Sequence, residues 1–191
     1  MRLIFLCLAL TSLACKGPIV KPSKLMLETE VIPTSAPADK ALLFIHRPRV
    51  QQGYGLYFGV WMDRQLIADL GNGHTTYLEV APGTHTIVGR SAEVKTIVEA
   101  DLAAGQIYDL YTKAAGVWIA SFRLHPMNAD SEERENIPAW MEEHRIVTLV
   151  PRDDPRYVKE QEKTQPKIDV ILEEAAEGDH KIFELKPSDS R

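Results

Sequence analysis

The sequence predicts a mainly β protein, a small antiparallel β-sandwich of the immunoglobulin-like class with a helical C-terminal extension. Short apolar or alternating segments, each bounded by turn residues, fill residues 40–124, and such spacing is typical of a sandwich or barrel of short strands. An apolar segment opens the chain, and most of the negative charge lies in the C-terminal third. The predicted domains are therefore a signal peptide (1–14), a lipidated cysteine and proline-rich linker (15–38), the sandwich (39–129), and an acidic extension with one strand and one kinked or broken helix (130–191).

The first 14 residues have the pattern of a secretory signal peptide. Arg2 supplies a positive charge, and residues 3–13 form an apolar stretch that is too short to span a bilayer. The stretch ends in Ser12-Leu13-Ala14-Cys15, which resembles the lipobox recognised by lipoprotein signal peptidase. Ordinary signal peptidase also accepts small residues at these positions, so both alternatives predict cleavage after Ala14.

The cysteine content favours lipidation of Cys15. Cys7 leaves with the signal peptide, so the mature chain keeps Cys15 alone and forms no intramolecular disulfide. Attachment of a diacylglycerol to this sulfur through a thioether would explain why the cysteine is present. Two or more fatty acyl chains, such as palmitate, hold a protein firmly on a bilayer. The alternative is a secreted protein with an incidental Cys15. Because Lys16 rather than Asp follows the cysteine, we expect the outer membrane of a bacterial cell envelope in preference to the inner one.

The segment that follows, residues 16–38, is predicted to be a linker. It contains four prolines and shows no sustained alternation or helical period. Proline keeps such a segment extended and prevents it from pairing as a central strand. We therefore expect a semi-rigid spacer that lifts the domain off the membrane.

Strands are predicted wherever an apolar or alternating run lies between turn residues. Asp63-Arg64 fits a two-residue hairpin turn, and glycine or proline occupies the other turns, as in Gly71-Asn72-Gly73 and Pro82-Gly83. The predicted strands of the sandwich are Ala41–Arg47, Leu56–Met62, Gln65–Leu70, Thr75–Val80, Thr84–Arg90, Glu93–Asp101, Gln106–Thr112 and Gly116–Leu124.

The C-terminal third is acidic. Residues 130–191 hold 10 Lys and Arg against 17 Asp and Glu, a net charge of −7, whereas residues 15–129 hold 11 against 10, a net charge of +1. Asp130 and Glu133 resemble a capping box, and Pro138 limits the helix they begin to about two turns. Arg145–Val150 is expected to form another strand.

A second helix is predicted to begin at Asp154-Pro155, with a capping residue and a first-turn proline in their preferred places. Pro166 is expected to break or kink it. An apolar stripe follows at helical spacing and is closed by Gly178. We expect this stripe to pack on the sandwich, with a partner-binding helix as the alternative. The stripe consists of Ile168, Ile171, Leu172 and Ala175.

The sequence shows no pattern typical of catalysis. None of the six histidines stands at metal-ligand spacing from another histidine or a cysteine, so no metal or cofactor is expected. His74 and His85 are expected to be the closest pair if neighbouring strands pair, and a structural role is expected for both. Solvated positions at turns or strand ends are expected for Asp63, Asp69, Asp101 and Asp109. Ser91, Ser121 and Ser131 lie outside any nucleophile elbow. An enzyme is therefore the less favoured class, and it stays an open alternative.

Two classes of partner are weighed. A pI of about 5.7 and the absence of a basic run argue against nucleic acid. Aromatic side chains of the sandwich are expected mainly in the core and on sheet faces, and the alternative is a surface that binds a glycan or peptide. These side chains are Tyr54, Tyr57, Trp61, Tyr77, Tyr108, Tyr111 and Trp118.

Four segments carry a resemblance to a known family: Lys40-Ala-Leu-Leu-Phe-Ile-His-Arg-Pro48, Val60-Trp-Met-Asp-Arg-Gln-Leu-Ile67, Tyr77-Leu-Glu-Val-Ala-Pro-Gly-Thr-His-Thr-Ile87 and Leu102-Ala-Ala-Gly-Gln-Ile-Tyr108. In this order they resemble the lipoprotein family catalogued as domain of unknown function 2846, over about residues 39–125. Arg64 stands where the hairpin of that family usually has Gly. The resemblance implies a small sandwich similar to PEGA and transthyretin-like domains, and it brings no reaction, cofactor or catalytic residue.

The sequence therefore predicts a lipid-anchored protein of the bacterial cell envelope with a binding or scaffolding role. Its expected partners are the membrane, through Cys15, and an envelope protein or glycan. The alternatives are a glycan- or peptide-binding module that uses the sandwich aromatics, and an envelope enzyme.

Overall fold

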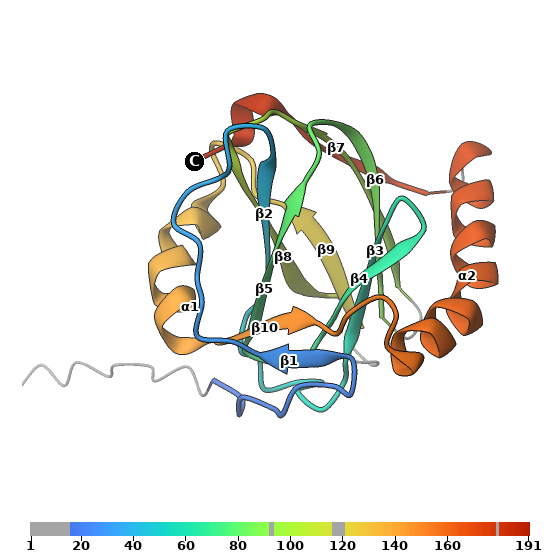
Figure 1. The fold of residues 1–191 in the computed structure, drawn as a ribbon, viewed down its shortest axis with the longest axis horizontal. Helices are drawn as coiled ribbons and strands as arrows, with labels where there is room; N and C mark the ends of the chain where they lie inside the picture. Colours follow the sequence, from blue (N-terminus) through green and yellow to red (C-terminus); the bar gives the residue numbers. More distant parts are fainter. Residues whose placement is uncertain (1–15, 92–93, 116–120, 179) are drawn as a thin grey trace, which may run out of the picture.

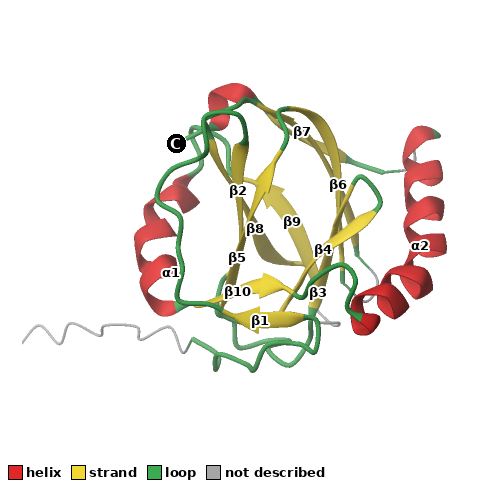
Figure 2. Cartoon of the chain, viewed as in Figure 1, coloured by secondary structure: helices red, strands yellow, loops and turns green. Residues whose placement is uncertain are grey.

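The computed structural model describes residues 16–91, 94–115, 121–178 and 180–191 and shows two β-sheets packed face to face, with a helix against the outer face of each (Figures 1 and 2). The six-stranded sheet contains, in spatial order, β1 (Met26–Glu28), β10 (Arg145–Leu149), β5 (His74–Val80), β2 (Ala41–Arg47), β8 (Ile107–Ala115) and β9 (Ser121–Pro126). The five-stranded sheet contains β11 (Ile182–Leu185), β7 (Lys95–Leu102), β6 (Gly83–Arg90), β3 (Phe58–Met62) and β4 (Gln65–Leu70).

The main core lies between the sheets, where inward-facing side chains alternate with outward-facing ones along each strand. On β3, for example, Val60 belongs to this core whereas Trp61 belongs to a second cluster under a helix. All seven residues of β2 are buried, because both faces of this central strand are covered. The fully buried members of the core include Leu43, Ile45, Phe58, Ile87, Val98, Leu110 and Leu124.

The predicted strands are confirmed over the residues that the structure describes, and the sandwich-like mainly β class with them. The pairing differs from the prediction, because the sheets are mixed rather than antiparallel. Parallel pairs join β2 to β8, β10 to β5 and β11 to β7. A parallel pair needs a long crossover connection, which the local turn signals in the sequence do not reveal.

The hairpin between β3 and β4 turns at Asp63 and Arg64, as predicted. Both residues have positive φ, 49° and 68°, which is the backbone of a type I′ turn. Arg64 therefore adopts this turn although it stands in the place of a glycine. The Asp63 carboxylate accepts a hydrogen bond from the Thr86 backbone N–H at 3.0 Å and so ties the turn to β6.

Residues 16–28 do not form the expected free spacer. Met26–Glu28 form β1, which pairs antiparallel with β10, and Leu25 is buried against the outer face of the five-stranded sheet. The Val20 backbone N–H donates to the Asn72 carbonyl at 3.2 Å. A short strand of this kind forms because a strand distant in the sequence pairs with it. The proline content of residues 16–38 therefore did not predict β1.

The helix predicted after Asp130 is organised differently. A 3-10 helix, η1 (Glu132–Asn136), leads directly into α1 (Ile137–Glu143), where Pro138 occupies the first turn. Proline is favoured in a first turn because its missing N–H has no intrahelical acceptor there. Pro138 therefore lies at the start of a helix, and the prediction that it ends one was wrong. Ile137 packs with Tyr111 on the outer face of the six-stranded sheet.

The second predicted helix is confirmed as α2 (Pro155–Ala176), which continues through Pro166 without a break and is bent along its length (Figure 1). The Asp154 carboxylate accepts from the Arg156 backbone N–H at 2.8 Å, and Gly178 ends the helix with φ +89°. Ile168 and Ile171 are buried against the five-stranded sheet, so the apolar stripe packs on the sandwich. No helix in the described ranges has the length and apolar character needed to cross a membrane.

The chain after α2 adds two elements that the sequence did not predict. Strand β11 joins the edge of the five-stranded sheet, and the short 3-10 helix η2 (Pro187–Asp189) leads to the last residue, Arg191. The Arg191 backbone N–H donates to the Ile107 carbonyl at 3.0 Å, so the tail also reaches the six-stranded sheet. The C-terminal extension is therefore part of both sheets.

Packing of α2 predicts a specific mutational result. Ile168→Ala removes a fully buried side chain and should lower the free energy of unfolding by about 2–5 kcal/mol. Val170→Ala, on the same helix at an exposed position, should change it by less than about 0.5 kcal/mol. Urea denaturation of the two variants measures both values. Equal effects would contradict the packing of this face.

Candidate functional site

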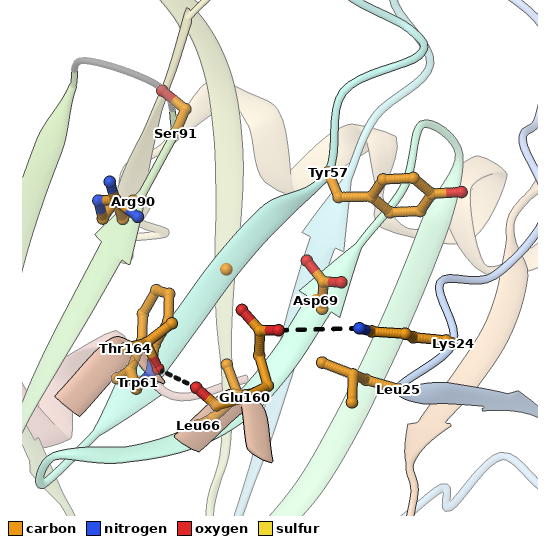
Figure 3. Close-up of a pocket in the computed structure, with 11 residues that line it drawn as sticks. Lys24, Leu25, Tyr57, Trp61, Leu66, Asp69, Arg90, Ser91, Glu160 and Thr164 are labelled. Carbon is orange, nitrogen blue, oxygen red and sulfur yellow. Dashed lines mark hydrogen bonds and ion pairs between the residues drawn. The ribbon is translucent and has the colours of Figure 1, made fainter. Parts of the chain in front are cut away.

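A cleft of about 240 Å³ lies on the outer face of the five-stranded sheet, between α2, strands β3 and β4 and the N-terminal segment (Figure 3). We call it the α2 cleft. Its volume is slightly below the roughly 300–1,000 Å³ of typical small-molecule sites. The cleft is lined by Lys24, Leu25, Tyr57, Gly59, Trp61, Leu66, Asp69, Arg90, Ser91, Glu160 and Thr164.

Two carboxyl groups, Asp69 on β4 and Glu160 on α2, are neighbours on one side of the cleft (Figure 3). Burial raises the pKa of Asp69, the negative charge of Glu160 adds to this shift, and a hydrogen bond from Ser23 opposes it. Glu160 pairs with Lys163 at 3.1 Å and with Lys24 at 3.9 Å. The cleft therefore holds two neighbouring carboxyl groups in a partly enclosed space that Lys24 and Arg90 also line.

Two aromatic rings form part of the lining. Tyr57 is 40% exposed, and its hydroxyl donates to the Lys21 carbonyl at 2.9 Å, which fixes the position of the ring. Trp61 is 4% exposed and packs over Gly59, where an added Cβ would lie 2.4 Å from the indole ring. Its indole N–H has no hydrogen-bond partner among the described residues.

The hydroxyl groups of the cleft are already engaged. Ser91 donates to the Phe122 carbonyl at 3.2 Å and accepts from the Phe122 N–H at 3.0 Å. Thr164 donates to the Glu160 carbonyl at 2.8 Å. A nucleophile needs an adjacent general base, and neither hydroxyl has one among these contacts. These contacts therefore do not present either hydroxyl as an activated nucleophile.

A second polar cluster lies on the outer face of the six-stranded sheet. The Asp109 carboxylate accepts from His46 Nε2 at 2.9 Å and from Arg191 Nε at 2.6 Å. His46 Nδ1 lies 3.0 Å from Thr75 Oγ1, which lies 2.9 Å from His144 Nδ1. We call these five residues the Asp109 network.

The Asp109 network has an order of acid, imidazole and hydroxyl that resembles a catalytic triad, but it is a structural cluster. Asp109, His46 and Thr75 are 2%, 0% and 0% exposed, so the hydroxyl is enclosed. Burial raises the pKa of Asp109, but the hydrogen bond from His46 and the guanidinium of Arg191 outweigh burial and hold this pKa below its usual value. Trp140 covers His46 with a ring separation of 5.4 Å.

The hydrogen bonds of the Asp109 network have one consistent direction when both imidazoles are neutral. His46 Nε2–H donates to Asp109, so His46 Nδ1 accepts from the Thr75 hydroxyl. The Thr75 oxygen then accepts from His144 Nδ1–H. Burial lowers the pKa of His144 to about 3, and the positive charges around it add to the shift, which keeps this ring neutral.

The two histidines expected to be closest lie in different sheets. His74, on β5, accepts from the Gly71 N–H and donates to the Val20 carbonyl, so it is fully satisfied in the interior. His85, on β6, lies 2.6 Å from Asp63 beside the hairpin turn. The prediction of proximity was wrong because β5 and β6 follow each other in the chain without pairing. The structural role expected for each residue is consistent with these contacts.

The remaining residues considered from the sequence differ in how far their side chains are buried. Tyr108 and Tyr111 are buried, Tyr77 is half-buried, and Tyr54 is exposed. Ser121 donates to the Ala115 carbonyl, and Asp101 lies exposed at the end of β7, as expected of a solvated strand end. Cys15 and Trp118 lie outside the described residues.

Sequence reasoning missed three groups of the α2 cleft and misjudged a fourth. Lys24, Arg90 and Glu160 were not singled out, and Asp69 was interpreted as a solvated carboxylate. Asp69 does carry a signal, because it is the charged residue within the otherwise apolar Leu66–Leu70. No such signal marks the other three, which come from the supposed linker, a strand end and a helix.

Comparisons with known proteins add no assignment. No protein-family model matches the chain, and no curated protein matches it. Among the described residues, no group of three or more histidine, cysteine or carboxylate side chains is placed to hold a metal ion. The resemblance to domain of unknown function 2846 stays a prediction.

Burial of neutral His144 predicts a pH dependence of stability. Because its folded pKa of about 3 lies below the ordinary 6.5, the unfolded chain binds the proton first as pH falls. This part of the stability is present in full above pH 6.5 and is lost progressively toward pH 3, by up to about 1.4 kcal/mol per pH unit.

The variant His144→Asn keeps an N–H donor for Thr75 and does not titrate. Urea denaturation at a series of pH values should therefore give a shallower fall in the free energy of unfolding for the variant than for the unchanged protein. Parallel curves for the two proteins would show that His144 is not the group responsible.

Proposed function

We propose that this chain is a lipid-anchored protein of the bacterial cell envelope that binds a small polar ligand in the α2 cleft. The observation that carries the binding role is the cleft itself, which brings together Asp69, Glu160, Lys24 and Arg90 with two aromatic rings. Enclosed sites with a few convergent polar groups and a carboxyl of shifted pKa are typical of ligand binding. The anchor is supported by the lipobox-like residues that end at Cys15.

We further propose that the domain belongs to the PEGA/transthyretin-like sandwiches of domain of unknown function 2846. Support comes from the places where the four resembling segments fall: on β2, on the β3–β4 hairpin, on β5–β6 and at the turn into β8. The parallel pairs of the two sheets are a departure from a purely antiparallel sandwich.

The alternative of a broad aromatic surface for glycans or peptides has less support. It requires several exposed rings in one place, whereas Trp61 is buried and Tyr77 is half-buried against Phe44. An envelope enzyme also has less support, because the two histidines expected to be closest, His74 and His85, do not share a site. These two histidines lie in separate sheets with separate partners.

Anchoring is tested at Cys15. In cells, the unchanged protein should fractionate with membranes, and its N-terminal peptide should carry the mass of a diacylglycerol and fatty acyl chains. Cys15→Ser should release the protein into the soluble fraction. An unmodified N-terminal peptide, or membrane association that persists in the variant, would contradict the anchor while leaving the cleft untouched.

Binding is tested by filling the cleft. Isotope-labelled protein lacking residues 1–15 is titrated with a library of small polar metabolites, and the backbone amides of Gly59, Leu66 and Thr164 should shift. Glu160→Trp fills the cleft and should abolish these shifts. The matched control is Glu162→Trp, which places the same ring at an exposed position of α2 and should bind as the unchanged protein does.

Two results would overturn the binding role. In the first, no compound shifts the cleft amides of the unchanged protein. In the second, compounds bind Glu160→Trp as tightly as they bind the control.

A further inference from the structure

The Asp69 carboxyl group of the α2 cleft accepts a hydrogen bond from Ser23 but lacks a close cationic partner among the described residues. It is largely enclosed, and no Lys or Arg nitrogen among the described residues lies within 4.0 Å of it. An ionised carboxylate in such a place loses hydration without gaining an ion pair. A positively charged group brought by a ligand would offset that loss.

Glu160 provides a second acceptor beside Asp69. Its cationic partners, Lys24 and Lys163, have side chains that are 65% and 62% exposed. Pairs between such exposed side chains contribute little, roughly 0–1 kcal/mol, so Glu160 is free to exchange them for a bound group. Two adjacent carboxylates with loose or absent partners favour a cation over an anion.

The rest of the lining suits an organic cation better than a metal ion. No third histidine, cysteine or carboxylate completes a metal-like cluster in the described part of the chain. The rings of Tyr57 and Trp61 line the same space, and aromatic faces attract ammonium groups. An ammonium group has three N–H donors, which two carboxylates can accept together.

We infer that the α2 cleft binds its ligand through a protonated primary amine held between the carboxylates of Asp69 and Glu160. This inference rests on the proposed function and names the chemical class of its ligand. Arg90 and Ser91 lie across the cleft from Asp69 (Figure 3), where the guanidinium can donate to an oxygen of the same ligand. An amino sugar and the amino end of a short peptide share this chemistry and match the small volume.

Matched pairs of probes test the inference on the labelled protein used above. The pairs are glucosamine with N-acetylglucosamine, and alanylalanine with N-acetyl-alanylalanine. Acetylation removes the charge and two donors while keeping the rest of each molecule. At least one free amine should bind about tenfold to a hundredfold more tightly than its acetylated partner, as expected for a charged hydrogen bond. The pair that responds identifies the amino sugar or the peptide as the source.

Variants assign the effect to the two carboxylates. Asp69→Asn and Glu160→Gln should each weaken the binding of the amine about tenfold or more and leave the acetylated probe unaffected. Asp101→Asn and Glu162→Gln make the same changes at exposed positions and should bind as the unchanged protein does. Asp69→Asn replaces a partly buried acid by a neutral isostere, so the fold should be retained, and a thermal melt verifies this.

The outcomes separate this inference from the proposed function. Equal binding of acetylated and free probes would contradict recognition of an amine and leave the binding role intact. The same holds if the library compounds that shift the cleft amides lack an amine. If the cleft amides respond to no compound at all, both fail. Unchanged affinity in Asp69→Asn and Glu160→Gln would overturn the assignment of the amine to this pair.

Discussion

The buried carboxylate of Asp109 is the group on which the arrangement of the chain depends. It binds His46 of the central strand β2 and Arg191 at the end of the chain, and the guanidinium supplies the positive charge that a buried carboxylate needs. Through His46 and Thr75 the same network reaches His144, the residue between α1 and β10. Strand β10 leads directly into α2, which forms one wall of the cleft. Loss of one partner of such a buried ion pair typically costs about 3–5 kcal/mol.

Local patterns predicted where the strands lie between tight turns, but not which of these strands pair. The turn of the β3–β4 hairpin was found to the residue, because Asp63-Arg64 is a two-residue turn between apolar runs. Edge strands β1 and β11 were missed, because three or four residues carry no period and their partners lie far away in the chain. Pro138 was misinterpreted for a different reason. A proline is compatible both with the end of one helix and with the start of the next, and the sequence alone does not distinguish the two.

The α2 cleft was not predicted because its charged groups come from three distant parts of the chain. Lys24 precedes β1, Asp69 is on β4, and Glu160 is on α2. Each residue taken alone is consistent with a solvated position. Their significance comes from burial and from proximity, and both of these are set by the docking of α2. The Asp109 network was missed for the same reason. The solvated position expected for Asp109 was wrong, because this residue is buried among the apolar residues of β8.

Arg47 connects the sandwich interior to the cleft. It is fully buried, donates to the Leu70 carbonyl at 2.6 Å and lies 4.4 Å from the centre of the Phe122 ring. Burial lowers the pKa of Arg47 to about 10, and the charge of Asp69 raises it, so the guanidinium stays protonated at neutral pH. The net shift of the Asp69 pKa is upward, because burial and the charge of Glu160 raise it, and the charge of Arg47 reduces this shift. A cation in the apolar core is costly, and here it favours the ionised form of Asp69, which is the form that accepts hydrogen bonds from a bound ammonium group.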